Sequence, residues 1–200
     1  MTSDEELYQA YIRGQKSSFD VLVKRYWDRV YQFVLRIVRD EATAEDVLIS
    51  TFYKLHTAAP TWEHRARFST FLYTIAWRES VSVLRAQKRR PNLVGGGETA
   101  DGPGWLETHR ADVADPEELV SQKNRIRQVD DVLKLLPEGH RAAFVLFYRE
   151  ELSIQEIAEA LDLQPGSVRA YLTFARTALR QACEAEEAAS LAVGSGRQKL

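Results

Sequence analysis

Three arginines lie close together near the carboxyl end of the chain, with no acidic residue among them. Arg169, Arg176 and Arg180 fall within one stretch that starts at Val168. Guanidinium groups bind phosphate oxygens, and they can donate two parallel hydrogen bonds to a guanine base. This segment could therefore bind nucleic acid if a helix places the three side chains along an exposed side.

The surrounding residues predict two helices joined by a tight turn. Ser153 precedes Glu156 by three positions, which is a capping-box pattern at the start of a helix. Pro165 suits the first turn of a second helix. The buried side of that helix would consist of Val168, Leu172, Ala175 and Leu179. Such a pair is the helix-turn-helix pattern, whose second helix enters the major groove of DNA. The alternative is an ordinary helical hairpin with a solvated basic face.

The side of this second helix opposite the buried residues is small and apolar at its centre and basic at its margins. Apolar side chains can pack against thymine methyl groups, while arginines suit guanine and phosphate. We therefore predict DNA contacts from Ser167, Arg169, Ala170, Tyr171, Thr173, Phe174, Arg176 and Arg180.

The overall composition is that of a globular protein. Of 200 residues, 44% are hydrophobic and 28% are charged, and the net charge is −2, which excludes a disordered or a membrane protein. The longest apolar run, Phe68–Trp77, is far shorter than the ~20 residues that cross a bilayer. The acidic amino terminus is unlike a signal peptide, and the single Cys183 excludes an internal disulfide. We expect a cytoplasmic protein.

The residue types needed for catalysis or metal binding do not occur at suitable spacings. The histidines form no H-x-x-x-H pair, and Gly95–Gly97 precede a glutamate, whose charge is wrong for a phosphate-binding loop. We therefore expect no catalytic residue, no metal and no cofactor. An enzyme with an accessory DNA-binding hairpin, such as a nuclease, is the alternative.

Helical periodicity without strand-like alternation predicts an all-α fold with two helical domains. The first covers residues 1–90 and the second covers residues 117–182. Between them, residues 91–116 are rich in glycine and predict a flexible linker. We expect the tail over residues 183–200 to be disordered.

A helix in the middle of the first domain would carry an apolar pair on its outer side. Thr43 and Asp46 predict its cap. The residues expected to face inward are Ala44, Val47, Leu48, Thr51, Phe52 and Leu55. Ile49 and Tyr53 then face outward, as is typical of a protein interface, although single apolar residues are also common on ordinary surfaces.

Two stretches of the first domain and one of the second carry recognisable patterns. They are AEDVLISTFYKL (Ala44–Leu55), RFSTFLYTIAWRESVSVLRAQKRR (Arg67–Arg90) and the segment Leu135–Arg180. The first two resemble region 2, and the third resembles region 4, of the bacterial sigma-70 family in its extracytoplasmic-function (ECF) group. The presence of both units in this order and at this spacing makes the resemblance specific.

The resemblance implies a sigma factor, which binds RNA polymerase core and directs promoter recognition, DNA melting and transcription initiation. The clamp helices of the largest polymerase subunit would contact Glu45, Asp46, Ile49, Ser50 and Tyr53. The arginine-bearing helix would bind the −35 promoter element. Many members are held by an anti-sigma factor, so such a regulator is a further expected partner.

The −10 promoter element would be bound as unpaired bases around a fourth helix, expected over residues 68–90. Bases stack on aromatic rings, and cations follow the phosphates. The residues with these properties are Trp62, His64, Arg65, Arg67, Trp77, Arg78, Arg85 and Lys88. Trp62 suits the core as well as a base contact, whereas Trp77 is expected at the surface, opposite Leu72 and Ile75.

Several residues depart from the family pattern. Ile49 and Ser50 stand where the family tends to have glutamine and an acidic residue, and Tyr171 and Phe174 occupy positions that are often basic. These departures leave the promoter sequence and the details of polymerase binding open. The main rival is a dimeric helix-turn-helix regulator, which would use only the second domain and a palindromic site.

Overall fold

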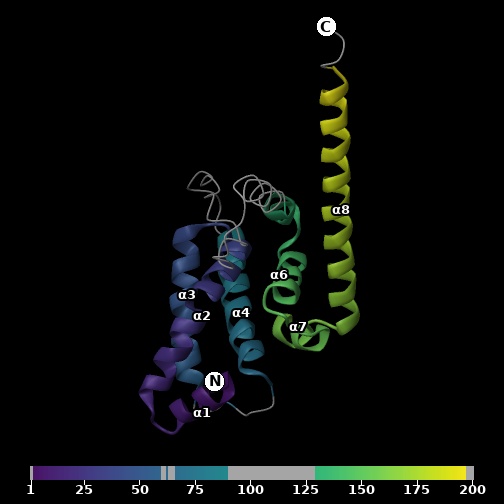
Figure 1. Ribbon diagram of the computed structural model, residues 1–200. Coiled ribbons are helices and arrows are strands. Elements are labelled where there is room, and N and C mark those ends of the chain that lie inside the picture. Colours follow the sequence, from purple (N-terminus) through teal and green to yellow (C-terminus); the bar gives the residue numbers. More distant parts are fainter. Residues whose placement is uncertain (1, 60–61, 63–65, 90–128, 197–200) are drawn as a thin grey trace.

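The computed structural model describes residues 2–59, 62, 66–89 and 129–196, with side chains up to residue 185. Within these ranges every regular element is a helix, which confirms the predicted all-α fold (Figure 1). The first unit holds α1 (Asp4–Ile12), α2 (Lys16–Val38), α3 (Glu41–Ala58) and α4 (Phe68–Arg89). The second unit holds a helical segment at 129–135, then α6 (Glu138–Tyr148), α7 (Ile154–Leu161) and α8 (Pro165–Gly196). The expected linker at 91–116 lies outside the described residues.

The helix starts follow from short side chains that accept hydrogen bonds from the first turn. At α7, the Ser153 hydroxyl accepts from the Glu156 amide while the Glu156 carboxylate accepts from the Ser153 amide, which confirms the predicted capping box. At α3 the predicted cap was wrong, because Asp40 and not Thr43 is the N-cap. Asp40 has an extended backbone, which places its carboxylate 2.8 Å from the Thr43 amide.

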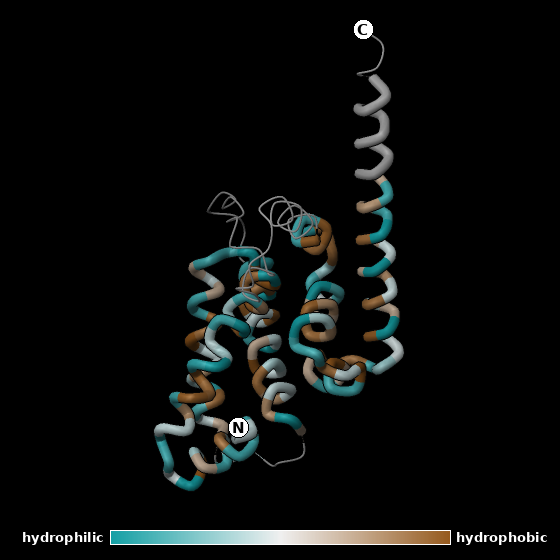
Figure 2. The backbone as a smooth tube through the Cα atoms, in the orientation of Figure 1, coloured by the Kyte–Doolittle hydropathy of each residue, from teal (hydrophilic) through white to brown (hydrophobic). Residues whose placement is uncertain are grey.

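Helix α2 is the central element of the first unit because it buries residues on more than one side. Its buried side chains include Leu22, Tyr26, Val30, Phe33, Val34 and Ile37. Helices α1, α3 and α4 all pack against it. Figure 2 shows hydrophobic and hydrophilic residues alternating along the helices, as expected where each helix buries one face. All six residues predicted to face inward from α3 are buried.

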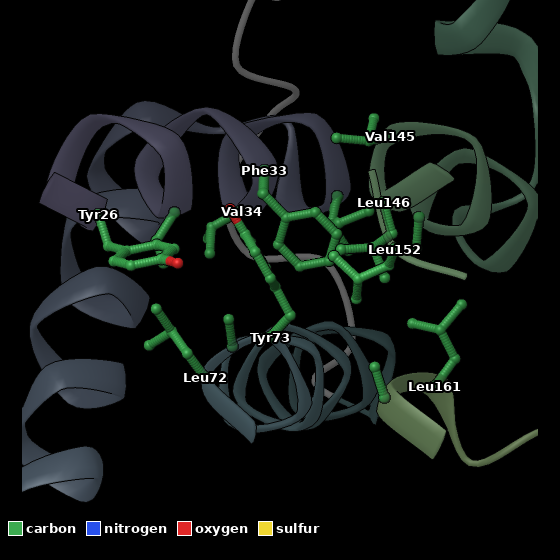
Figure 3. Close-up of a cluster of buried hydrophobic side chains, with 14 of the residues drawn as sticks. Tyr26, Phe33, Val34, Leu72, Tyr73, Val145, Leu146, Leu152 and Leu161 are labelled. Carbon is green, nitrogen blue, oxygen red and sulfur yellow. The ribbon is translucent and has the colours of Figure 1, made fainter. Parts of the chain in front are cut away.

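The two units share one hydrophobic core, which the sequence analysis did not predict. Figure 3 shows Phe33 and Val34 of α2 and Leu72 and Tyr73 of α4 gathered with side chains of the second unit. Those second-unit residues are Val145, Leu146, Leu152 and Leu161. Helix α7 lies against α4, and α6 lies against α2. Burial of apolar surface on both sides therefore stabilises the docked arrangement.

Helix α8 continues well past the point where the sequence analysis placed a disordered tail. It spans 32 residues and ends at Gly196, and its last turns project beyond the other helices (Figure 1). The segment after Cys183 is rich in alanine and glutamate, which have high helix propensity. A helix already nucleated at Pro165 extends readily through such residues, because propagation is much easier than nucleation.

The cap of α3 gives a first test. Asp40→Ala should lower the free energy of unfolding by about 1 kcal/mol, whereas Asp40→Asn should change it little, because asparagine caps about as well as aspartate. Hydrogen bonds from the Thr43 hydroxyl and amide lower the pKa of Asp40. Its stabilising contribution is therefore present at neutral pH and is lost as the pH falls through that lowered pKa. Urea unfolding at neutral and acid pH measures both effects, and equal losses for the two variants would contradict the cap.

The shared core gives a second test. Leu146 is fully buried, so Leu146→Ala should lower the free energy of unfolding by about 2–5 kcal/mol. Leu135 is 85% exposed, and Leu135→Ala should change it by no more than about 0.5 kcal/mol. Since the units share a core, circular dichroism and tryptophan fluorescence should report one shifted transition. Separate transitions, with only one of them shifted by Leu146→Ala, would show that the units fold independently.

Candidate nucleic-acid and polymerase interfaces

The turn between α7 and α8 fixes the direction of the basic helix. Asp162 ends α7 in the left-handed conformation, with φ of 56°, and the Leu163 amide donates to the Ala158 carbonyl at 2.8 Å. Pro165 then begins α8, as predicted. Val168, Leu172 and Ala175 are buried, and Leu179 is half-buried. The predicted apolar stripe therefore holds α8 against the rest of its unit, and the opposite side is left at the surface.

Some of the predicted −35 residues on α8 are exposed, and the others are half-buried against neighbouring residues. The exposed residues are Arg169, Ala170, Thr173, Phe174, Arg176 and Arg180. Ser167 and Tyr171 are half-buried. Arg180 lies 3.9 Å from Glu184, a solvent-exposed pair of the kind that contributes little to stability. Arg169 makes no ion pair within the part of the chain that the structure describes.

Tyr171 is packed against α6 and is not on the open side of α8. Its ring stacks on His140 with centroids 3.9 Å apart. A Cβ atom added at Gly139 would lie only 3.1 Å from the tyrosine ring, so a larger residue there would crowd the stack. Phe174 meets the same histidine edge-on at 5.0 Å but remains 53% exposed. Partial burial lowers the pKa of His140, which favours its neutral form in this cluster.

Arg176 is also held by α6. Its Nε donates to the Tyr148 hydroxyl at 2.6 Å, and its guanidinium lies over the rings of Phe147 and Tyr148. Cation–π contacts of this kind orient an arginine that remains at the surface. Arg169 and Arg180 are therefore the α8 arginines whose side chains are least constrained by other helices.

The outer side of α3 exposes apolar residues beside acidic ones. Ile49 is 59% exposed and Tyr53 is 66% exposed, while Glu45 and Asp46 are exposed beside them. Ser50 is only half-exposed, and its hydroxyl donates to Glu79 of α4 at 2.7 Å. The serine that departs from the family pattern is thus bonded to a neighbouring helix.

Sequence reasoning missed one aromatic residue next to this α3 face. Trp27 of α2 stacks on Phe52 with centroids 5.5 Å apart and is 41% exposed. The signal that could have found it is a tryptophan that lies off the buried stripe of α2, between Tyr26 and Asp28. Trp27 therefore lies against the helix that carries Ile49 and Tyr53, and we call these three exposed residues the apolar patch.

The predicted −10 residues occupy several different environments. Trp62 packs edge-on against Tyr8, with ring centroids 5.0 Å apart. This position fits a core residue better than a residue that contacts a DNA base. Trp77 is half-buried and packs against the core, and its expected position at the surface was therefore wrong in part. The reason is that α4 has neighbours on several sides, because it contacts α7 of the second unit as well as α2 and α3. His64 and Arg65 lie outside the described residues.

The remaining −10 candidates are cations along α4 and just before it. Arg78 and Arg85 are exposed. Arg67 lies 3.3 Å from Glu156, and Lys88 lies 3.2 Å from Glu138. Both of these carboxylates belong to the second unit, so part of the predicted DNA surface faces the docked helices.

Among the residues that the structure describes, no group of three histidine, cysteine, aspartate or glutamate side chains could hold a metal ion. None of the helices in the described ranges is long and apolar enough to cross a membrane.

Two regions of this chain match known family models. Residues 22–90 match the family model of sigma-70 region 2, and residues 126–179 match that of sigma-70, region 4. The RNA polymerase sigma-H factor of Pseudomonas aeruginosa is 31% identical over 183 residues, which cover 90% of this chain and 94% of the relative. The ECF RNA polymerase sigma factor SigW of Bacillus subtilis is 30% identical, over 84% of this chain and 90% of the relative.

Solved structures show the same fold at lower sequence identity. CnrH, solved with the cytosolic domain of CnrY, superposes with a TM-score of 0.64 at 20% identity, covering 92% of this chain and 99% of CnrH. The sigma factor RpoE of Bartonella quintana, solved with the anti-sigma factor NepR, gives a TM-score of 0.66 at 18% identity, covering 83% of this chain and 96% of RpoE.

Proposed function

The chain belongs to the sigma-70 family, in its ECF group, and from this premise we propose that it binds RNA polymerase core and directs promoter-specific transcription initiation. One observation carries the proposal. A region 2 unit with an exposed apolar patch and a region 4 helix-turn-helix with an exposed basic side occur on one chain in the family's order. The proposed role is that of a specificity subunit and not of an enzyme.

Each proposed contact uses a different part of the molecule. The outer side of α3, with Glu45, Asp46, Ile49, Ser50 and Tyr53, would bind the polymerase clamp helices. The exposed side of α8 would bind the −35 element as duplex DNA, since a helix fits the major groove. The cations of α4 would follow the phosphates of the melted −10 strand. An anti-sigma factor, such as the one bound to the Bartonella quintana protein, is a further proposed partner.

Run-off transcription with purified polymerase core tests the proposal as a whole. Adding this protein to core should give transcripts from a subset of promoters, and sequencing of the bound DNA should return a −35 and a −10 element. A dimeric regulator would instead bind a palindrome without core. Failure of the protein to bind polymerase core in a pull-down assay would contradict the proposed function.

The apolar patch gives a specific test of polymerase binding. Ile49→Arg combined with Tyr53→Ala should weaken core binding at least about tenfold, because truncating a central anchor residue of an interface costs about 2 kcal/mol or more. Ile12→Arg replaces an exposed apolar residue on α1 and should leave the affinity unchanged. Circular dichroism would establish that all variants are folded. Equal affinity of the double variant and the original protein for core would exclude this face.

Phe174 gives a specific test of −35 recognition. If its ring contacts a thymine methyl, replacing that thymine by uracil should weaken binding by about 0.8 kcal/mol, which is about fourfold. Phe174→Ala should abolish this sensitivity at one position. Arg180→Ala, which would remove a phosphate contact, should weaken binding to all sequences and keep the sensitivity. Equal uracil sensitivity with and without the phenylalanine ring would place Phe174 outside the DNA interface.

A further inference from the structure

Helix α1 supplies a cap for the first turn of α4. The amide of Phe68, the first residue of α4, donates to the Glu5 carboxylate at 2.9 Å. The first amides of a helix have no acceptor within that helix and need one from elsewhere. Ala66 and Arg67, the two residues before Phe68, carry no side-chain acceptor. Glu5 therefore does for α4 what Asp40 does for α3, although Glu5 and Phe68 are 63 residues apart in the sequence.

The same helix also holds two aromatic residues at this place in the chain. The ring of Tyr8 meets Trp62 edge-on, with centroids 5.0 Å apart, and meets Phe68 with centroids 5.1 Å apart. The Tyr8 hydroxyl donates to the Leu55 carbonyl of α3 at 2.6 Å. Helix α1 therefore fixes the positions of Trp62 and Phe68 relative to α3.

Helix α1 can act as a support because its own position is set by buried and polar contacts. Tyr8 is fully buried in the core. The Asp4 carboxylate pairs with Arg25 of α2 and accepts from the Tyr26 hydroxyl at 2.6 Å. Asp4 and Glu5 are consecutive, so one carboxylate holds α1 on α2 while the next reaches the start of α4 (Figure 1).

We propose that Glu5 is a positioning residue for the −10 contact, because its carboxylate fixes the first turn of α4 and, with that turn, Arg67. The inference rests on the proposed function, which takes Arg67 as one of the cations that bind the melted −10 strand. Arg67 directly precedes the capped amide, and its carbonyl accepts from the Phe71 amide at 3.2 Å. Its backbone therefore belongs to the turn that Glu5 holds, while its side chain is 68% exposed.

Loss of the cap should affect one DNA contact and not the other. Without its acceptor the first turn of α4 frays, so the guanidinium of Arg67 must be ordered when the strand binds. Ordering a side chain on binding lowers the affinity. The −35 contact is made by α8, whose start is set by Pro165 and by the turn after α7. That contact should not depend on Glu5.

Three substitutions distinguish this role from a general loss of stability. Glu5→Ala removes the acceptor, whereas Glu5→Gln keeps a side-chain carbonyl that can accept from the Phe68 amide. The two variants have the same net charge, so a difference between them reports the hydrogen bond and not the charge. Asp40→Ala removes the corresponding cap of α3 and is the control for the stability that a lost cap costs.

Each variant is assembled with saturating polymerase core, and its affinity is measured at one salt concentration for two fluorescein-labelled probes. One probe is the single strand of the −10 element, and the other is a duplex of the −35 element, both from a promoter recovered by sequencing. Glu5→Ala should weaken binding to the single strand at least about threefold and leave binding to the duplex unchanged. Glu5→Gln and Asp40→Ala should bind both probes as the original protein does.

Three results would overturn the inference. They are equal single-strand affinities of the two Glu5 variants, an equal loss of affinity for both probes in Glu5→Ala, and the same loss in Asp40→Ala. If Glu5→Ala is unfolded by circular dichroism, Glu5→Asp replaces it, because its carboxylate is one methylene shorter and falls short of the Phe68 amide. The same order of affinities is then expected.

Run-off transcription by the original protein distinguishes failure of this inference from failure of the proposed function. Transcription by the original protein, together with equal single-strand affinities of the Glu5 variants, would overturn only the positioning role. Failure of the original protein to bind polymerase core would contradict the proposed function itself.

Discussion

A single buried carboxylate sets the geometry on which the rest of this structure depends. Glu150 lies two residues after the end of α6, and its side chain has no exposure to solvent. An ionised carboxylate is stable in such a place only when it is paired, and Arg29 of α2 supplies the pair. Tyr73 is buried beside it, and burial together with the nearby carboxylate raises the pKa of the tyrosine well above its usual value. The chain between α6 and α7 is thereby fixed against the first unit.

The apolar contacts around this pair explain why the two units dock with a defined orientation. Leu146 precedes the buried carboxylate and Leu152 follows it, and both enter the core formed by α2 and α4. The hydrophobic contacts contribute most of the favourable free energy, since they remove the largest apolar area from water. The buried ion pair contributes orientation, because a displaced Glu150 would lose its close pair with Arg29 at 2.5 Å; Arg149 lies farther away, at 3.7 Å.

The distribution of charge explains how a protein with a net charge of −2 is suited to bind DNA. Cations gather on α4 and on the outer side of α8, while acidic residues such as Glu45 and Asp46 lie on the exposed side of α3. Polyanion binding depends on such local charge and not on the total. The apolar patch lies on α3 and α2, whereas these cations lie on α4 and α8.

The sequence by itself determined the local structure, because capping and helical periodicity depend on residues close together in the chain. Ser153, Pro165 and the stripe from Val168 to Ala175 were enough to predict the helix-turn-helix and its exposed side. The cap of α3 was predicted at Thr43 instead of Asp40, because the position of the cap depends on the backbone conformation where α2 ends. The docking of the units was decided only by the tertiary structure. Arg29 and Glu150 are 121 residues apart, and no local pattern connects them. Packing between helices also moved Trp77 into contact with the core and Tyr171 onto His140 of α6, because a helical wheel describes one helix and not its neighbours.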